Sequence, residues 1–161
     1  MGEQSLAECV SLKVREGERL AAGGLSLAVL YTPGHTDDSY SLLLRPQGHA
    51  PRVFTGDTLL IRGTGRTDFQ NGDAAAQYES LFGKLLRLPD ETWVYPAHDY
   101  NGMTVSTIGE ERRFNPRLQV RDRAEYVALM DGLKLDNPRL MDIAVPANRA
   151  CGLRPAATAK T

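Results

Sequence analysis

Cysteine is scarce in this chain. Its 161 residues include two, Cys9 and Cys151, which stand far apart and form no CxxC pair. The first residues also lack the basic and apolar regions of a signal peptide. This pattern is typical of free thiols in a reducing compartment. We therefore expect both cysteines to be unpaired and the protein to be cytoplasmic.

Long apolar runs and a charge excess of one sign are also absent. No stretch of 18 apolar residues occurs, so we expect no transmembrane helix. A net charge of −1 gives no electrostatic reason to bind nucleic acid or an anionic membrane. There is no Gly-x-Ser-x-Gly nucleophile motif, and no Lys-Ser/Thr follows the Gly63-x-Gly65 pair as a phosphate loop requires.

What the sequence does contain is a series of short apolar runs, each closed by a turn signal. Runs of this kind predict strands. We expect strands at residues 11–15, 25–31, 40–44, 52–54 and 93–95.

Three helices are predicted between and after these strands. The first begins after Asp73, a good N-cap, and its apolar residues repeat with helical spacing up to Pro89. The second runs from the capping box at Thr107 to Phe114, and the third from about residue 122 to 133. We expect irregular structure over 137–161. Strands followed by helices indicate an α+β fold with functional residues on loops at one end of a sheet.

Three of these strands are followed by residues that can bind a metal ion. His35 comes after Pro33-Gly34, Asp57 after Gly56, and His98 after Pro96-Ala97. Two imidazoles and one carboxylate are the ligands of many non-haem Fe(II) sites, and with a water they also describe catalytic zinc. We therefore expect these three residues to converge. His98 could instead orient substrate, and each histidine could be a plain polar turn residue.

Other residues allow two interpretations each. Arg66 and Asp68 are either a surface ion pair of small value or an arginine held beside an anionic substrate. Tyr100 could reach a metal-bound ligand or close its own loop. Arg117 could bind a carboxylate. His49 follows no strand, and we expect it to be exposed.

Residues 25–153 resemble the metallo-β-lactamase-fold superfamily. Within it they are most similar to the glutathione persulfide dioxygenases, which are relatives of glyoxalase II. The motifs that carry the resemblance are Arg62-Gly-Thr-Gly-Arg-Thr-Asp-Phe69, Tyr95-Pro-Ala-His-Asp-Tyr100, Glu110-Glu-Arg-Arg-Phe-Asn-Pro-Arg117 and Ala144-Val-Pro-Ala-Asn-Arg-Ala-Cys-Gly152. The first of these is far more specific than the Thr-Pro-Gly-His of the histidine loop.

The resemblance assigns roles to residues of this chain. It makes His35 and Asp57 iron ligands, and it puts His98 at a position that binds a second metal only in binuclear relatives, which corrects the triad. It places Arg66, Asp68 and Tyr100 near the reaction. It makes Tyr100 and Arg117 substrate-binding residues. Cys151 matches a cysteine near the end of the family's chain.

The resemblance also has a gap. The family's His-x-His-x-Asp-His motif is absent. The resemblance implies an αββα sandwich, so we expect residues 1–153 to be its C-terminal portion, with the first sheet partly missing. We expect residues 154–161 to be a disordered tail.

The resemblance implies an enzyme. It would use Fe(II) and O₂ to oxidise glutathione persulfide, or a similar thiol substrate, to sulfite and glutathione. A zinc-dependent glutathione thioesterase is the alternative, and an inactive remnant is a third reading for this chain. We also consider a homodimer.

Overall fold

The computed structural model describes residues 1–7, 9–69, 71–136 and 140–152. Six strands form one sheet in the spatial order β1-β2-β3-β4-β7-β8. Neighbours are antiparallel except β4 and β7, which are parallel. The strands are β1 (Arg19–Ala22), β2 (Leu25–Tyr31), β3 (Tyr40–Leu44), β4 (Arg52–Gly56), β7 (Trp93–Pro96) and β8 (Ser106–Thr107).

A small hairpin and several helices complete the described chain. The hairpin consists of β5 (Leu59–Leu60) and β6 (Gly63–Thr64). The first helix, α1 (Ala74–Tyr78), continues through a π-helical turn at Glu79–Lys84 and a 3₁₀ turn at Leu85–Arg87. The remaining helical segments are α2 (Ile108–Phe114), a 3₁₀ turn at Pro116–Leu118, α3 (Arg123–Asp131) and α4 (Met141–Arg149).

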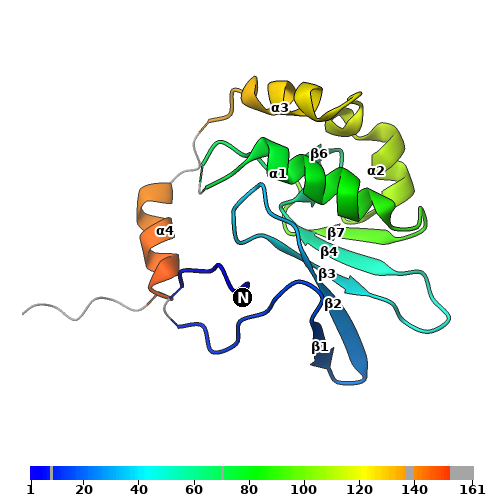
Figure 1. Cartoon of the computed structure of the whole chain (residues 1–161), viewed down its shortest axis with the longest axis vertical. Helices are drawn as coiled ribbons and strands as arrows, with labels where there is room; N and C mark the ends of the chain where they lie inside the picture. The colour runs from blue at the N-terminus through cyan, green and yellow to red at the C-terminus, as the bar shows by residue number, and fades with distance from the viewer. Residues whose placement is uncertain (8, 70, 137–139, 153–161) are drawn as a thin grey trace, which may run out of the picture.

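Helices α1, α2 and α3 lie together on one side of the sheet (Figure 1). The core forms between them, because alternate residues of the strands point toward the helices. It contains Val53 and Val94 from the sheet, Leu81 and Leu85 from the first helix, and Tyr126 from α3, all almost fully buried. Helix α4 lies apart from this layer, beside the N-terminal segment (Figure 1).

The opposite side of the sheet exposes apolar side chains. Phe54 and Trp93 are each 40% exposed, and Leu25 is 50% exposed. The ring of Phe54 stacks on that of Tyr95 with the centroids 5.5 Å apart. The described residues thus form one main sheet with its helical layer on one face.

Most of the predicted elements are confirmed. Strands β2, β3, β4 and β7 cover the runs predicted for them. The two predicted N-caps, Asp73 and Thr107, each accept a hydrogen bond from the backbone N–H three residues later, and Asp122 at the start of the third helix does the same. The α+β class is confirmed.

Two local predictions are wrong. No strand forms at 11–15, where Val14 makes only an isolated bridge to Gly2; the strand that pairs with β2 is β1. The segment predicted to be irregular contains α4, because Pro146 removes only one helical hydrogen bond and the good helix formers Ala144 and Ala147 lie near it. The turn after α4 is closed by Gly152, whose N–H donates to the carbonyl of Ala147. The predicted tail at 154–161 lies outside the described residues.

The prediction of two free thiols is also wrong. Cys9 and Cys151 form a disulfide across 142 residues of sequence, with their Cα atoms 6.1 Å apart. The fold brings the N-terminal segment to the end of α4, a proximity that neither cysteine's local sequence reveals. A reducing compartment no longer follows from the cysteines.

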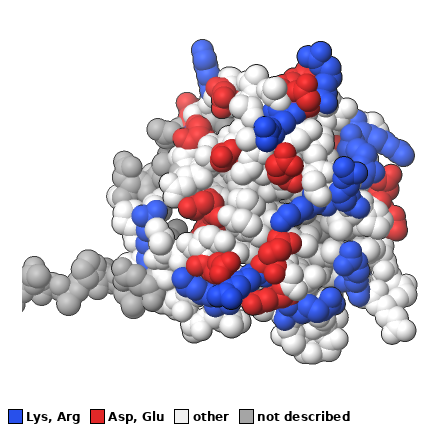
Figure 2. Space-filling model, viewed as in Figure 1, with Lys and Arg blue, Asp and Glu red and all other residues white. Residues whose placement is uncertain are grey.

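No helix in the described part of the chain is long and apolar enough to cross a bilayer. On the face shown in Figure 2, basic and acidic side chains are interspersed without an extended patch of either sign. This distribution agrees with the net charge of −1.

Candidate metal and substrate site

The three predicted metal-binding residues lie at one edge of the sheet. His35 follows β2, Asp57 follows β4 and His98 follows β7. Strands β4 and β7 are parallel, and β2 points the same way because two antiparallel steps separate it from β4. The carboxyl ends of all three strands therefore lie at the same end of the sheet. The loops that follow these ends bring the three side chains together.

Asp57 lies between the two imidazoles. Its Oδ1 and Oδ2 lie 2.7 and 2.9 Å from Nδ1 of His98. Its Oδ2 lies 3.7 Å from Nε2 of His35. The His35 and Asp57 side chains are each 20% exposed, whereas His98 is 58% exposed. The Asp57 carboxylate and the His35 imidazole are thus both half-buried, and the His98 imidazole on the other side of the carboxylate is more exposed.

A hydrogen bond fixes the orientation of His35. Its Nδ1 lies 2.8 Å from the carbonyl oxygen of Arg66. A carbonyl can only accept, so Nδ1 carries the proton and Nε2 presents its lone pair. This is the arrangement that orients histidine ligands in metal sites. The ring nitrogen that carries the lone pair, Nε2, therefore lies on the side of Asp57.

Gly65 lets the β5–β6 hairpin approach both residues. A Cβ at this position would lie 2.2 Å from the carbonyl oxygen of Asp57 and 2.8 Å from two ring atoms of His35. The Gly65 N–H donates to that same Asp57 carbonyl at 2.7 Å. Its own carbonyl accepts from the buried Gln77 amide at 3.1 Å. Glycine is needed here because no side chain fits between the two loops.

His35 and Asp57 suit two positions of one metal ion. Ligands about 2.1 Å from an ion stand roughly 3 to 3.5 Å apart, and the 3.7 Å between Nε2 and Oδ2 is close to that spacing. Within the described ranges, however, no three His, Cys, Asp or Glu side chains form a set that could hold a metal ion. The triad predicted from spacing is therefore together in space but is not a three-ligand site.

A cavity of about 760 Å³ opens beside these residues. It is lined by His35, Asp57 and His98, by the hairpin from Leu60 to Arg66, and by Phe69, Asp99, Tyr100, Asn101, Arg117, Leu135, Asp136, Ala144, Val145 and Asn148. Arg66, Tyr100 and Arg117 therefore share it with the ligand-type residues. Asp68 does not line it and borders a smaller cavity below α1 and α3.

The guanidinium of Arg66 is heavily engaged. Its Nε and Nη2 donate to the two carboxylate oxygens of Asp68 at 2.6 and 2.5 Å. Its Nη1 donates to the carbonyl of Asp136 at 2.8 Å, and its Cζ lies 4.2 Å from the ring centre of Phe69. The bidentate bond with Arg66 lowers the pKa of Asp68. Arg66 is thus fixed in place, and its carbonyl in turn orients His35.

Arg117 and Tyr100 are held very differently. Arg117 donates from Nη1 to the carbonyl and the Oγ1 of Thr64, and burial lowers the pKa of its guanidinium. Tyr100 is 80% exposed, and its ring stacks on that of His98 at 6.3 Å. His49 is exposed and lies outside the cavity lining, as expected.

A buried carboxylate, which the sequence analysis did not single out, supports the β5–β6 hairpin. Glu111 of α2 is fully buried. Its oxygens accept from the backbone N–H and guanidinium of Arg62, from Ser106 Oγ and from Asn115 Nδ2. Arg62 has a φ of 59°, a backbone conformation that side chains rarely adopt. The only sequence signal is that both residues belong to the family motifs.

The comparisons with known proteins agree with this geometry. Persulfide dioxygenase ETHE1, mitochondrial, from Mus musculus is 47% identical over 143 residues, which cover 89% of this chain and 55% of that protein. The crystal structure of ETHE1 from Myxococcus xanthus matches with a TM-score of 0.86 at 55% identity, covering 94% of this chain and 65% of that one. The chain thus spans about half the length of the curated relatives it matches.

A third comparison concerns a metal-loaded protein. The crystal structure of TTHA1623 in a di-iron-bound form matches with a TM-score of 0.54 at 35% identity, covering 65% of this chain and 47% of that one. The model of the metallo-beta-lactamase superfamily matches residues 10–98, which include His35, Asp57 and His98. The resemblance drawn from the sequence motifs is confirmed, and the chain belongs to the metallo-beta-lactamase superfamily.

Proposed function

We propose that the cavity beside His35 and Asp57 binds iron and glutathione persulfide, and that the complete site oxidises the persulfide with O₂. One persulfide, one O₂ and one water then give one glutathione, one sulfite and two protons. The observation that carries the proposal is the 47% and 55% identity to two proteins named ETHE1, the first of them a persulfide dioxygenase. The placement of His35 and Asp57 in one cavity supports it.

The donor set suits iron in part. His35 Nε2 and Asp57 would supply one nitrogen and one oxygen ligand, and a further donor is needed to reach the two-histidine, one-carboxylate set of non-haem iron enzymes. When bound, iron provides open coordination positions for the persulfide sulfur and O₂ and accepts electrons during the oxidation. TTHA1623, crystallised in a di-iron-bound form, supports iron as a metal that this family takes.

The chain's own residues bind and orient. The Arg66 carbonyl holds His35 in the tautomer that leaves Nε2 free, and Asp68 holds Arg66. Arg117 keeps N–H donors beyond its contact with Thr64, and these suit a carboxylate of glutathione. Tyr100, with its exposed hydroxyl, lies where it can position a ligand entering the cavity. In this assignment Arg66 and Asp68 act through position and do not contact the substrate directly.

The alternative is a zinc-dependent glutathione thioesterase with two metals. The observation that favours it is the placement of Asp57 between two imidazoles. In that assignment His35, Asp57 and His98 would hold the two metal ions, which would supply the nucleophile for hydrolysis of the thioester. We rank the thioesterase second, because the relatives of 45–47% identity are named persulfide dioxygenase.

Oxygen uptake distinguishes these functions. The chain, loaded with Fe(II) and checked for metal content, is given glutathione persulfide in an oxygen electrode while sulfite is measured. We expect uptake and sulfite to appear together and to disappear in His35→Ala but not in His49→Ala. Iron-loaded protein that consumes no O₂, yet hydrolyses S-lactoylglutathione with zinc, would instead establish the thioesterase. Metal-loaded protein inactive in both assays would support the inactive remnant.

Partners and location remain predictions. We propose glutathione persulfide or a similar thiol and O₂ as substrates, a cytoplasmic location, and no nucleic-acid or membrane partner. A homodimer is tested by light scattering on the purified chain.

A further inference from the structure

The Cys9–Cys151 disulfide joins two distant parts of the chain at the surface. It links the N-terminal segment to the residue that follows the last turn of α4. Cys9 is exposed and Cys151 is half-buried. A disulfide in such a position is accessible to small thiolates, which break disulfides by direct attack on one sulfur.

Helix α4 has few other attachments. Seven of its nine residues have a described side-chain burial; all but Val145 are exposed, and Ile143 is 68% exposed. Within the described residues, every hydrogen bond made by the segment 140–152 stays inside that segment. Figure 1 shows α4 apart from the three helices that cover the sheet. The disulfide is therefore its strongest described attachment.

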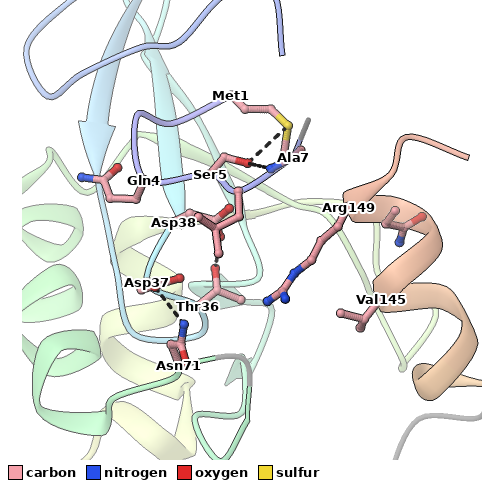
Figure 3. A pocket seen from close by; sticks show the side chains of 12 residues that line it. Met1, Gln4, Ser5, Ala7, Thr36, Asp37, Asp38, Asn71, Val145 and Arg149 are labelled. Atoms are coloured by element: carbon pink, nitrogen blue, oxygen red, sulfur yellow. Dashed lines mark hydrogen bonds between the residues drawn. The ribbon is translucent and has the colours of Figure 1, made fainter. Parts of the chain in front are cut away.

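The helix nevertheless forms a wall of the candidate site. Val145 and Asn148 line the cavity that contains His35 and Asp57. The same two residues line a second cavity of about 230 Å³, on the side of the N-terminal segment. Figure 3 shows Arg149 reaching across this second cavity toward Thr36, the neighbour of His35. Movement of α4 would thus change access to both cavities.

We propose that the Cys9–Cys151 disulfide is an exchange site for small thiols and acts as a latch that holds α4 against the His35 cavity. A thiolate attacks one sulfur, the S–S bond breaks, and a mixed disulfide forms while the other cysteine leaves as a thiolate. A second thiol releases the first cysteine. In total, two small thiols are oxidised to one disulfide, and the protein gains two thiols. The proposal stands on the disulfide and α4, not on the function proposed above.

The first test is whether the bond exists and exchanges. The full chain is purified without reductant, alkylated, digested and analysed by mass spectrometry, with and without prior treatment with dithiothreitol. We expect a linked pair of peptides containing Cys9 and Cys151, converted to two alkylated peptides by the reductant. Two free thiols in the untreated chain would overturn the proposal, as would a linked pair that dithiothreitol leaves intact in the folded protein.

The second test measures the latch itself. Hydrogen exchange is followed in α4 and, as an internal control, in α2 (Ile108–Phe114). We expect reduction to speed exchange in α4 on the order of tenfold or more while α2 is unchanged, because α4 loses its main attachment. Diethyl pyrocarbonate should also modify His35 faster after reduction, with the exposed His49 as the reference. Equal exchange in α4 and equal His35 reactivity before and after reduction would refute the latch.

Variants separate the bond from the reagent. Cys9→Ser should behave like the reduced chain whether or not dithiothreitol is present, and Ser11→Ala, on the same exposed segment, should respond like the unaltered chain. If Cys9→Ser does not fold, the reduced unaltered chain still decides the matter. A Cys9→Ser variant that folds and keeps slow exchange in α4 would contradict the proposal.

Discussion

Nδ1 of His98 lies 2.7 Å from Oδ1 and 2.9 Å from Oδ2 of Asp57, so one imidazole faces both oxygens of the carboxylate. The same carboxylate is 3.7 Å from Nε2 of His35. Asp57, which follows the end of β4, therefore lies near both His98 and His35. Its position explains why a metal ligand and its neighbour are hard to tell apart from the spacing of residues alone.

The two contacts of Asp57 predict different losses of metal affinity. Asp57→Asn removes the proposed anionic ligand, and we expect Fe(II) or Zn(II) binding to fall below detection. His98→Ala removes a residue that orients the carboxylate, a change that typically costs about 10- to 100-fold in affinity. Anaerobic calorimetric titration of the chain measures both, with His49→Ala as the control. Equal loss in the two variants would make His98 a ligand rather than a neighbour.

Gly65 makes a sharp prediction about the hairpin. In Gly65→Ala the new Cβ would meet the carbonyl oxygen of Asp57 at 2.2 Å and the ring of His35 at 2.8 Å. We expect the backbone to shift, the free energy of unfolding to fall by about 1–3 kcal/mol or more, and metal binding to be lost. Thermal unfolding and metal titration measure the two effects.

Gly63→Ala is the matched control in the same hairpin. Its new Cβ would have only the Leu60 Cβ as a neighbour, at 3.9 Å. This is an ordinary contact, so we expect little change in stability or metal binding. A Gly65→Ala variant no more affected than Gly63→Ala would show that the close approach of the two loops is not needed.

The sheet was largely predictable because its strands carry local signals. Strands β2, β3, β4 and β7 are short apolar runs closed by Pro or Gly turns, and such runs need no distant information. Helix α4 was missed because Pro146 and small residues are common in loops, and no side chain caps its N-terminus. Strand β1 was missed because three of its four residues are exposed, the fourth is half-buried, and its apolar residues do not alternate.

The site was predictable only in outline. Three strands ending in His35, Asp57 and His98 indicated a shared edge, but the missing three-ligand geometry depends on atomic positions. The burial of Glu111 could not be predicted, because Glu111 lies in a run of charged residues, Glu110–Arg113, that is typical of a solvent-exposed helix. The Cys9–Cys151 disulfide could not be predicted from local sequence, because the two cysteines are 142 residues apart. Contacts of this kind are set by the whole fold rather than by neighbours in sequence.

The buried carboxylate of Glu111 predicts a large stability effect. Glu111→Ala leaves Arg62 with only its longer contact to the half-exposed Glu110, and breaking one side of a buried ion pair typically costs about 3–5 kcal/mol. Urea unfolding followed by circular dichroism measures the loss. The neighbouring Glu110→Ala is the control, since its side chain is 50% exposed and such surface pairs contribute about 0–1 kcal/mol. Similar losses in the two variants would contradict the described burial.

Tyr126 predicts how stability changes at high pH. Its hydroxyl donates to Gln77 Oε1 at 2.8 Å, and burial raises its pKa from 10.0 to about 12. The folded state therefore keeps this proton more tightly than the unfolded chain. Its contribution is fully present below pH 10 and is lost as the pH rises from 10 to 12, a total of about 3 kcal/mol.

Tyr126→Phe tests this pH dependence directly. The variant has no proton to release at this position, so its free energy of unfolding should fall less steeply between pH 10 and 12 than that of the unaltered chain. Urea unfolding at pH 8, 10 and 11.5 measures the slopes, and Tyr100→Phe, at an exposed tyrosine, is the control. The slopes of the free energy of unfolding against pH should differ between Tyr126→Phe and the unaltered chain only above pH 10. Below pH 10, Tyr126 is protonated in both the folded and the unfolded chain. Parallel curves for the unaltered chain and Tyr126→Phe across the whole range would mean that the Tyr126 hydroxyl is not held in the buried contact with Gln77.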